Sequence, residues 1–253
     1  MSEEVREIEA LAAELRAHVA ALAVAGWKAF PGEPVPLEKP AEAPVALATQ
    51  WSARAAAARS AADVESGDSG LARIRADMGE DCRRCNLCKE RRQIVFGVGS
   101  PEARLVIVGE APGYEEDLQG EPFVGPAGQM LDRMLENVLG LQRSQVYICN
   151  VVKCRPPKNR NPLPDEVAAC QPFLERQIQA IAPHALLVLG NVAHKTLFQT
   201  EQGITKARGI WKDWKGIPAL PTFHPAYLLR NPADKRLVFD DLVTMKAKLS
   251  ELA

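Results

Sequence analysis

The side chains best suited to chemistry are a carboxylate, an amide and an imidazole, each placed where a short apolar run ends. Glu110 and His224 follow such runs, and Asn150 is the last residue of another. Runs of this length and β-branched composition predict buried strands of a parallel sheet. Because ligands of parallel sheets bind beyond the carboxyl ends of the strands, we expect Glu110, Asn150 and His224 to converge on one site.

The cysteines form a second candidate site. Cys82 and Cys85 make a CxxC pair, Cys88 follows three residues later, and Cys154 and Cys170 lie far downstream. Four thiolates from two separated segments can hold either a structural zinc ion or an iron–sulfur cluster, and the spacing leaves both open. A redox pair is the weaker interpretation, because no thioredoxin-like βαβ pattern precedes the CxxC.

The start of the chain bears on the state of these thiols. It is acidic (Met-Ser-Glu-Glu) where a secretory signal would be basic, so we expect a cytoplasmic protein with reduced thiols rather than disulfides. No apolar run approaches the roughly 20 residues that cross a bilayer. Cys149, inside a predicted strand, is expected to be a buried apolar residue. The three-residue intervals of Cys82, Cys85 and Cys88 match a ferredoxin-type run and leave the role of Cys88 open.

The net charge of −1 hides an uneven distribution. Residues 1–80 carry 13 acidic and 8 basic side chains, a net of −5, and the remaining residues hold 19 acidic and 23 basic side chains, a net of +4. A modestly basic domain can bind phosphates if its cations cluster. The composition, 47% hydrophobic and 25% charged, is that of an ordinary globular protein.

The first third of the chain is predicted to be an extension without recognisable chemistry. Its predicted parts are an amphipathic helix over 3–24, a proline-rich linker over 31–44, an alanine-rich segment over 46–62 and a flexible joint over 65–70. We interpret residues 1–78 as a tether or docking helix, whose partner the sequence does not identify, and residues 79–253 as the working domain.

The working domain alternates predicted strands with predicted helices. The strands are expected at 104–109, 146–150, 185–190 and 219–223, and the helices at 127–139, from 164 onward, after 190 and at 234–251. This alternation predicts an α/β fold: a doubly wound, mostly parallel four-stranded sheet flanked by helices.

Three stretches resemble the motifs of the family 4 uracil-DNA glycosylases, iron–sulfur-containing members of the uracil-DNA glycosylase superfamily. They are GEAPGYEED at 109–117 with PFVG at 122–125, NVVKCRPPKNR at 150–160, and HPAYLLR at 224–230. The likeness runs from Cys82 to Asp241 and does not include residues 1–78. A related subgroup, trapped covalently on its substrate, carries a basic insertion with a histidine after the first motif. Here no histidine lies between His18 and His184, so trapping is not expected.

The resemblance implies a monomeric, monofunctional enzyme of base-excision repair. It would hydrolyse the N-glycosidic bond of deoxyuridine in DNA, release uracil and leave an abasic site, with no dissociable cofactor. The resemblance also implies a structural 4Fe-4S cluster bound by Cys82, Cys85, Cys154 and Cys170, with Cys88 outside the ligand set.

The same resemblance assigns roles to the strand-end residues. Glu110 would position a water and stabilise the sugar cation, His224 would donate to a uracil oxygen, and Asn150 would select uracil through its amide. Other pocket groups would be the backbone of Ala111, the carboxylate of Glu116 and the ring of Phe123, which would stack on the base. Without the motifs, an asparagine at a turn, a histidine fixing a His-Pro turn and a core phenylalanine would be the plain alternatives.

Two further segments are predicted to contact DNA. The first is a proline-broken loop that carries Lys153, Arg155, Lys158 and Arg160. The second follows the histidine and would supply an apolar wedge and a phosphate contact, through Tyr227, Leu228, Leu229 and Arg230. A solvated charge run and a buried helical turn are the respective alternatives.

Two other functions remain open. One is an enzyme of the same fold with a different base preference, which excision assays on defined lesions would detect. The other is a non-catalytic iron–sulfur module that binds uracil-DNA without releasing the base.

Overall fold

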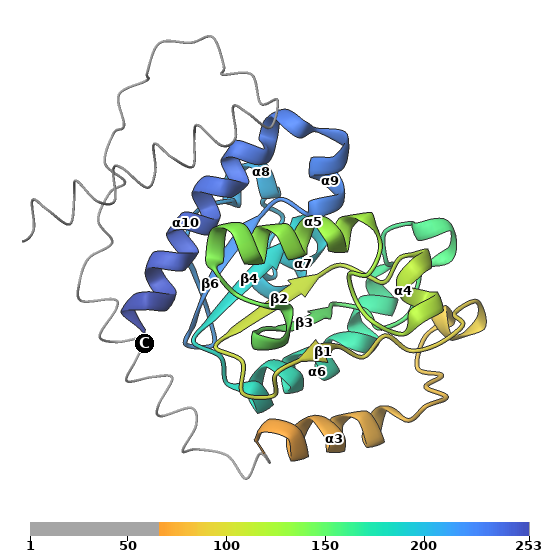
Figure 1. Ribbon diagram of the computed structural model, residues 1–253. Coiled ribbons are helices and arrows are strands. Elements are labelled where there is room, and N and C mark those ends of the chain that lie inside the picture. Colours follow the sequence, from red (N-terminus) through yellow and green to blue (C-terminus); the bar gives the residue numbers. More distant parts are fainter. Residues whose placement is uncertain (1–65, 253) are drawn as a thin grey trace, which may run out of the picture. The chain divides into compact units, whose positions relative to one another are not determined.

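The computed structural model describes residues 66–252, which form a central sheet with helices on both faces (Figure 1). The expected helix over 3–24, the linker over 31–44 and the alanine-rich segment over 46–62 lie outside the described residues. Within residues 66–252, no helix is long and apolar enough to cross a membrane.

The sheet has six strands in the order β1-β3-β2-β4-β6-β5. Their bounds are β1 Val98–Gly99, β2 Leu105–Gly109, β3 Tyr147–Asn150, β4 Ala185–Leu189, β5 Lys212–Trp214 and β6 Ile217–Thr222. The four central strands, β3, β2, β4 and β6, are parallel and are the four that the sequence predicts. The mostly parallel sheet is therefore confirmed. The expected count of four strands is corrected to six, because β1 and β5 pair antiparallel at the two edges.

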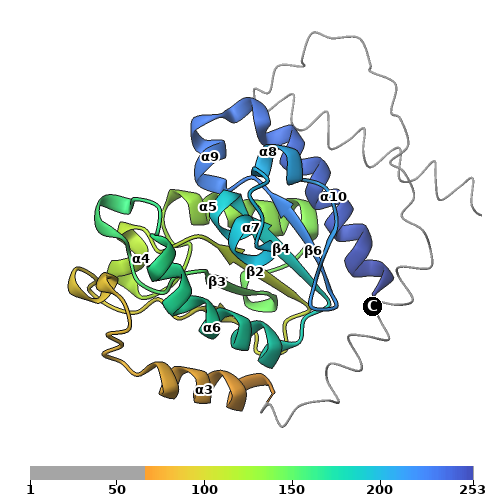
Figure 2. The same cartoon turned by 180° about the vertical axis from the view of Figure 1, so that it is seen from behind.

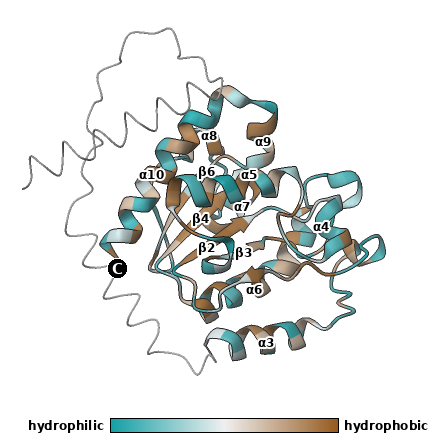
Figure 3. Ribbon diagram, in the orientation of Figure 1, coloured by the Kyte–Doolittle hydropathy of each residue, from teal (hydrophilic) through white to brown (hydrophobic). Residues whose placement is uncertain are grey.

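Each central strand is buried on both faces, and its side chains alternate between two cores. In β2, Leu105 and Ile107 pack into the core beneath α5 (Pro126–Met134) and α10 (Lys235–Glu251). Val106 and Val108 face the opposite core, which is formed with α3, α6 and α7. Figure 1 shows the first of these faces and Figure 2 the second. In Figure 3 the strands are the most hydrophobic elements, as expected for a sheet covered on both faces.

The helices predicted in the working domain are confirmed, and several short ones were not predicted. The longer ones are α5, continued by a π-helical turn at Leu135–Leu139, α6 Pro164–Ile181, α7 Gly190–Phe198 and α10. The short ones are α4 Tyr114–Gln119, α8 Ile204–Ala207, α9 Pro225–Arg230, and single 3-10 turns at Asn86–Lys89, Arg143–Gln145, Pro157–Asn159 and Pro232–Asp234. Proline in the first turn begins both α5 and α6, where the missing N–H has no cost.

Helix α3 (Gly67–Met78) corrects the expected flexible joint. Residues 67–70 form its first turn, and Leu71, Ile74 and Met78 are buried in the core that includes α6. Their spacing of three and four residues places them on one helical face. Residues 67–78 are therefore continuous with the folded domain.

Candidate functional site

The three strand-end residues lie at the carboxyl edge of the parallel strands, as the sequence predicts. Glu110 directly follows β2, and Asn150 is the last residue of the adjacent strand β3. Gly109, the last residue of β2, pairs in register with Asn150. His224 lies two residues beyond β6 and caps α9. Parallel strands bring these residues to one edge whatever their separation in sequence.

The ring of Phe123 connects the two sides of this cluster. It stacks on the His224 ring with a centroid distance of 5.4 Å and an interplanar angle of 28°. A Cβ at Gly109 would lie 2.4 Å from Asn150 Oδ1 and 2.6 Å from Phe123 Cζ. The Phe123 ring thus lies between His224 on one side and Asn150 on the other, and Gly109 leaves the space that Asn150 and Phe123 occupy.

Backbone geometry around Phe123 is unusual for a bulky residue. Its φ of 56° lies in the left-handed region, which phenylalanine rarely adopts. A Cβ at Gly128, in the first turns of α5, would lie 1.8 Å from the Phe123 carbonyl oxygen. The turn is therefore pressed against the helix, and strained conformations of this kind concentrate at functional sites.

The carboxylate of Glu116 holds the same turn. Its Oε1 accepts from the backbone N–H groups of Val124 and Gly125, both at 3.0 Å, and its Oε2 accepts from Gly113 N at 3.0 Å. Glu116 thus joins the segment after Glu110 to the turn that carries Phe123. This arrangement supports the pocket-shaping role predicted for it.

Asn150 brings an unsatisfied acceptor into the cluster. Its side chain is buried, and Oδ1 has no hydrogen-bond partner among residues 66–252. A buried acceptor without a partner costs about 1–3 kcal/mol, so such a group is expected to meet a donor when a ligand binds. The hydrogen bonds Val151 N to Gly109 O (3.0 Å) and Val152 N to Glu110 O (3.2 Å) fix the backbone on which it stands.

The two ionisable groups of the cluster are both shifted by burial. Burial raises the pKa of Glu110, which is half-buried beside the half-buried Ala111. Burial lowers the pKa of His224 to about 4, and the nearby Arg230 charge lowers it further, against a smaller opposing effect of Glu116. The imidazole is therefore neutral at pH 7. Its Nδ1 accepts from Ala226 N at 3.1 Å, which leaves the proton on Nε2.

The residues of helix α9 that were expected to contact DNA differ in exposure to solvent. Leu228 is 1% exposed and packs in the core, so its expected role in the wedge is corrected: it is a core residue. Leu229 is 43% exposed and Arg230 is also exposed. Tyr227 is half-buried, and its hydroxyl donates to Asp234 Oδ2 at 2.6 Å. Only Leu229 of the apolar pair faces solvent.

The four basic residues of the loop at 153–160 also differ in exposure and in their partners. Lys153 is 1% exposed, so the structure gives it no access to a phosphate. Arg160 makes a two-pronged hydrogen bond to Glu166, at 2.8 and 2.7 Å. Arg155 lies 5.0 Å from the centroid of the exposed Tyr114 ring. Lys158 is exposed at a left-handed position, with φ 54°.

The Tyr114–Arg155 stack was not predictable from the sequence, because its two members come from different motifs. The glycine that ends β2 was part of the predicted strand, but the side chains that fill the space beside it come from other segments. A Cβ at Gly190, the first residue of α7, would lie 3.0 Å from His224 Cβ. The close approach of α7 to His224 thus depends on that glycine.

Four cysteines gather on the face of the sheet covered by α6. Cys82, Cys85, Cys154 and Cys170 all belong to, or pack against, the same buried cluster. Burial raises the pKa of Cys154 to about 12, with Cys170 and Cys85 adding to the rise as neighbouring thiols. Cys149 is fully buried within β3, as expected of an apolar residue.

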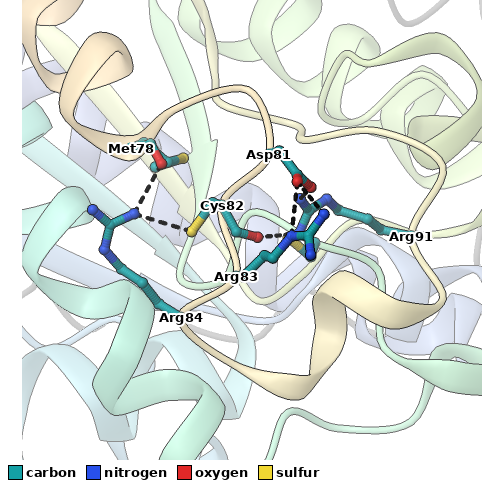
Figure 4. A network of polar contacts seen from close by, with 7 residues as sticks. Met78, Asp81, Cys82, Arg83, Arg84 and Arg91 are labelled. Atoms are coloured by element: carbon teal, nitrogen blue, oxygen red, sulfur yellow. Dashed lines mark hydrogen bonds and ion pairs between the residues drawn. The ribbon is translucent and has the colours of Figure 1, made fainter.

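Two arginines donate to sulfurs of this group, and Figure 4 shows Arg84 directed at Cys82. Arg84 donates to Cys82 Sγ at 3.3 Å and to the carbonyl of Met78 at 2.8 Å. Arg91 donates to the Cys82 carbonyl at 2.7 Å and to Cys154 Sγ at 3.5 Å. Such donors favour thiolates and tune the clusters that thiolates bind.

The chemistry of the donor set limits what these cysteines can bind. Four thiols from separated segments form the Cys₄ set that either a structural zinc ion or a 4Fe-4S cluster accepts. Cys82, Cys85, Cys154 and Cys170 therefore fit a 4Fe-4S cluster in residue type and number.

A separate pocket of about 840 Å³ lies at the opposite, amino edge of the sheet. It is bordered by Arg104 before β2, His184 before β4 and Trp214 of β5. It shares no residue with the strand-end cluster, and we assign the chemistry to the carboxyl edge.

Sequence comparisons relate the chain to known proteins. Residues 96–244 match the model of the uracil DNA glycosylase superfamily. The chain is 42% identical over 183 residues to a type-4 uracil-DNA glycosylase of Saccharolobus solfataricus, covering 69% of this chain and 85% of that protein. It is 45% identical to proteins of the same name from Sulfurisphaera tokodaii (68% and 80% covered) and Thermotoga maritima (70% and 94% covered).

Proposed function

Because this chain belongs to the uracil-DNA glycosylase superfamily, among the type-4 enzymes, we propose that it hydrolyses the N-glycosidic bond of deoxyuridine in DNA. The products are free uracil and an abasic site. The observation that carries this proposal is the buried, unpartnered Oδ1 of Asn150 beside the Phe123 ring. An aromatic face next to an orphaned acceptor is suited to a planar base that presents an N–H.

Recognition of uracil depends on Asn150. The ring N–H of uracil donates to Oδ1, and the amide N–H of Asn150 donates to the adjacent uracil carbonyl. Cytosine has an acceptor and an amino group at these positions, so it would leave buried polar groups unpaired. Sites that depend on such pairing reject the wrong base by large factors.

Bond cleavage leaves negative charge on uracil and positive charge on the sugar. The neutral His224 donates from Nε2 to the uracil oxygen, as its Nδ1 contact with Ala226 N allows. The ionised Glu110 holds the attacking water and stabilises the sugar cation. The backbone N–H of Ala111 adds a donor to the same oxygen.

The base reaches this pocket only when it leaves the helical stack, at a cost of a few kcal/mol. Leu229, exposed on α9, is suited to fill the vacated space, and Arg230 beside it is suited to a phosphate. Lys158, also exposed, is the cation of the basic loop most accessible to a second phosphate. The substrate is therefore uracil-containing DNA.

A 4Fe-4S cluster is the cofactor that the type-4 relationship implies, held by Cys82, Cys85, Cys154 and Cys170. When bound, the cluster would cross-link the chain segments that carry these cysteines. Glycosidic hydrolysis transfers no electrons, so we assign the cluster a structural role.

Single-turnover excision from a uracil-containing oligonucleotide tests the proposal. Glu110→Gln and His224→Ala each lower the rate roughly tenfold or more, the scale of losing one transition-state donor. Both proteins keep the fold at the assay temperature, although His224→Ala also loses the cap of α9 and melts at a lower temperature. Lys206→Ala, an exposed residue of α8, is the control. Wild-type rates in both variants would reject these roles. Tight binding without base release would indicate a DNA-binding module, and release from other lesions alone a different base preference.

A further inference from the structure

Lys153 is the one lysine of the basic loop that does not face solvent. Its side chain is 1% exposed, and Nζ donates to the backbone carbonyl of Asn150 at 2.7 Å. The ammonium thus folds back onto the residue that ends β3. The buried ammonium of Lys153 thus lies only three residues from Asn150, whose amide is proposed to bind the base.

The backbone of Lys153 contacts the cysteine cluster. Its N–H donates to Cys170 Sγ at 3.3 Å, and its carbonyl accepts from Val95 N at 2.8 Å. The next residue in the chain is Cys154. One residue therefore touches the strand end through its side chain and the proposed cluster ligands through its backbone.

A buried ammonium needs anionic neighbours, because transfer of an isolated charge from water costs several kcal/mol. None of the ion pairs formed within residues 66–252 includes Lys153. Among residues 66–252, the side chains near it that can carry negative charge are the thiols of Cys149, Cys170 and Cys154. A 4Fe-4S cluster with four thiolates has a net negative charge and would meet this need.

We propose that Lys153 is a positioning residue that links the iron–sulfur cluster to uracil recognition. The cluster's charge keeps the ammonium buried, and the ammonium holds the Asn150 carbonyl so that Oδ1 faces the pocket. This inference rests on the proposed function for the role of Asn150 and for the identity of the cluster. It replaces the phosphate contact that the sequence predicts for Lys153.

The substitution Lys153→Met tests the link, because methionine fills much of the buried volume without charge or donor. Two quantities are measured on the cluster-loaded protein: the reduction potential of the cluster and single-turnover uracil excision at saturating DNA. Loss of a nearby cation destabilises the more negative, reduced cluster, so the potential shifts to a more negative value. The excision rate falls roughly tenfold, the scale of one charged hydrogen bond, while DNA affinity changes less than about twofold.

Lys89→Met is the matched control. Lys89 is an exposed lysine next to Cys88, so water screens its charge and both readouts stay at wild-type values. Lys153→Gln, which keeps a donor but no charge, supplies the same readouts if the methionine variant does not accumulate. Its potential shifts as far, and its rate falls less.

An unchanged potential together with an unchanged rate in the Lys153 variants would overturn the inference. So would a loss of DNA affinity with a wild-type rate at saturation, since that pattern belongs to a phosphate contact. The wild-type protein separates this failure from failure of the proposed function: absence of uracil release there rejects the function, whereas the potential still reports on Lys153.

Discussion

Replacing Gly109 with alanine probes the pocket at the point where its parts meet. The new Cβ would lie 2.4 Å from Asn150 Oδ1 and 2.6 Å from Phe123 Cζ. Carbon atoms in contact stand about 3.5–4.0 Å apart, so one or both side chains must move by about 1 Å. The substitution adds a single methyl group and removes no polar atom. Any change in rate therefore comes from displacement of the Asn150 and Phe123 side chains.

The expected size of the effect differs between stability and rate. Overpacking of this kind costs about 1–3 kcal/mol, and each kcal/mol lowers the melting temperature of a domain of this size by about 2–4 °C. A displacement of about 1 Å at catalytic groups costs roughly 100-fold in rate. Gly109→Ala is thus expected to remain folded at 25 °C while excision falls by two orders of magnitude.

Single-turnover excision and thermal unfolding, measured on the same preparation, separate the two effects. Gly203→Ala is the control, because a Cβ at Gly203 meets nothing within 4 Å and its φ of −72° suits any residue. A Gly109→Ala protein that excises uracil at the wild-type rate would refute the reasoning, since Asn150 and Phe123 would then not be the groups that grip the base.

Three further predictions follow from the same geometry. Excision falls as the pH drops through the raised pKa of Glu110, because protonation removes the anion, and a pH–rate profile of Glu110→Gln lacks this limb. The free energy of unfolding falls as the pH drops from about 6.5 towards 4, because the unfolded chain protonates His224 before the folded chain does; denaturant titrations of His224→Gln show a smaller fall. Leu229→Ala reduces excision from duplex DNA more than from single strands, because only a duplex leaves a stack to fill, whereas the core substitution Leu228→Ala mainly lowers the melting temperature. Excision assays on both substrates and thermal unfolding of both variants check this.

The strand ends were predictable because parallel topology alone brings them together. The apolar runs of β2, β3, β4 and β6 identified four strands. Once the end of each run is known, the sequence directly names the residue that lies at that edge of the sheet. The edge strands β1 and β5 are two and three residues long. They arise from pairing with a neighbour, which leaves no periodic pattern in their own sequences.

The surface proposed to contact DNA was harder to predict, because tertiary contacts decide which side chains are exposed. Lys153 and Lys158 lie in the same loop, yet one is buried under the Asn150 carbonyl and the other is exposed. Leu228 and Leu229 are adjacent and chemically identical, and only the direction of α9 separates core from surface. Charge and hydropathy along the chain do not encode such differences.

The sequence of helix α3 contains signals for both a flexible joint and a helix, and the prediction followed the wrong one. Two glycines and two serines in residues 66–70 suggested a joint, whereas Leu71, Ile74 and Met78 carried the helical spacing. Burial of three large apolar side chains, each worth about 1.5–3 kcal/mol, outweighs the poor helix propensity of two glycines, about 1 kcal/mol each.

We therefore propose that the folded domain begins near residue 66 rather than at 79, and two truncations test this. Removal of residues 1–65 leaves α3 and the site intact, so single-turnover excision stays within about twofold of the full chain. Removal of residues 1–78 also deletes the apolar face of α3 and the Asp77 and Met78 carbonyls that bind Arg84, the donor to Cys82 Sγ. The second protein is expected to melt at a much lower temperature and to lose its brown iron–sulfur colour on mild warming. Equal stability of the two truncations would place the boundary at 79 after all, and a rate lost with residues 1–65 alone would assign that segment a part in the chemistry.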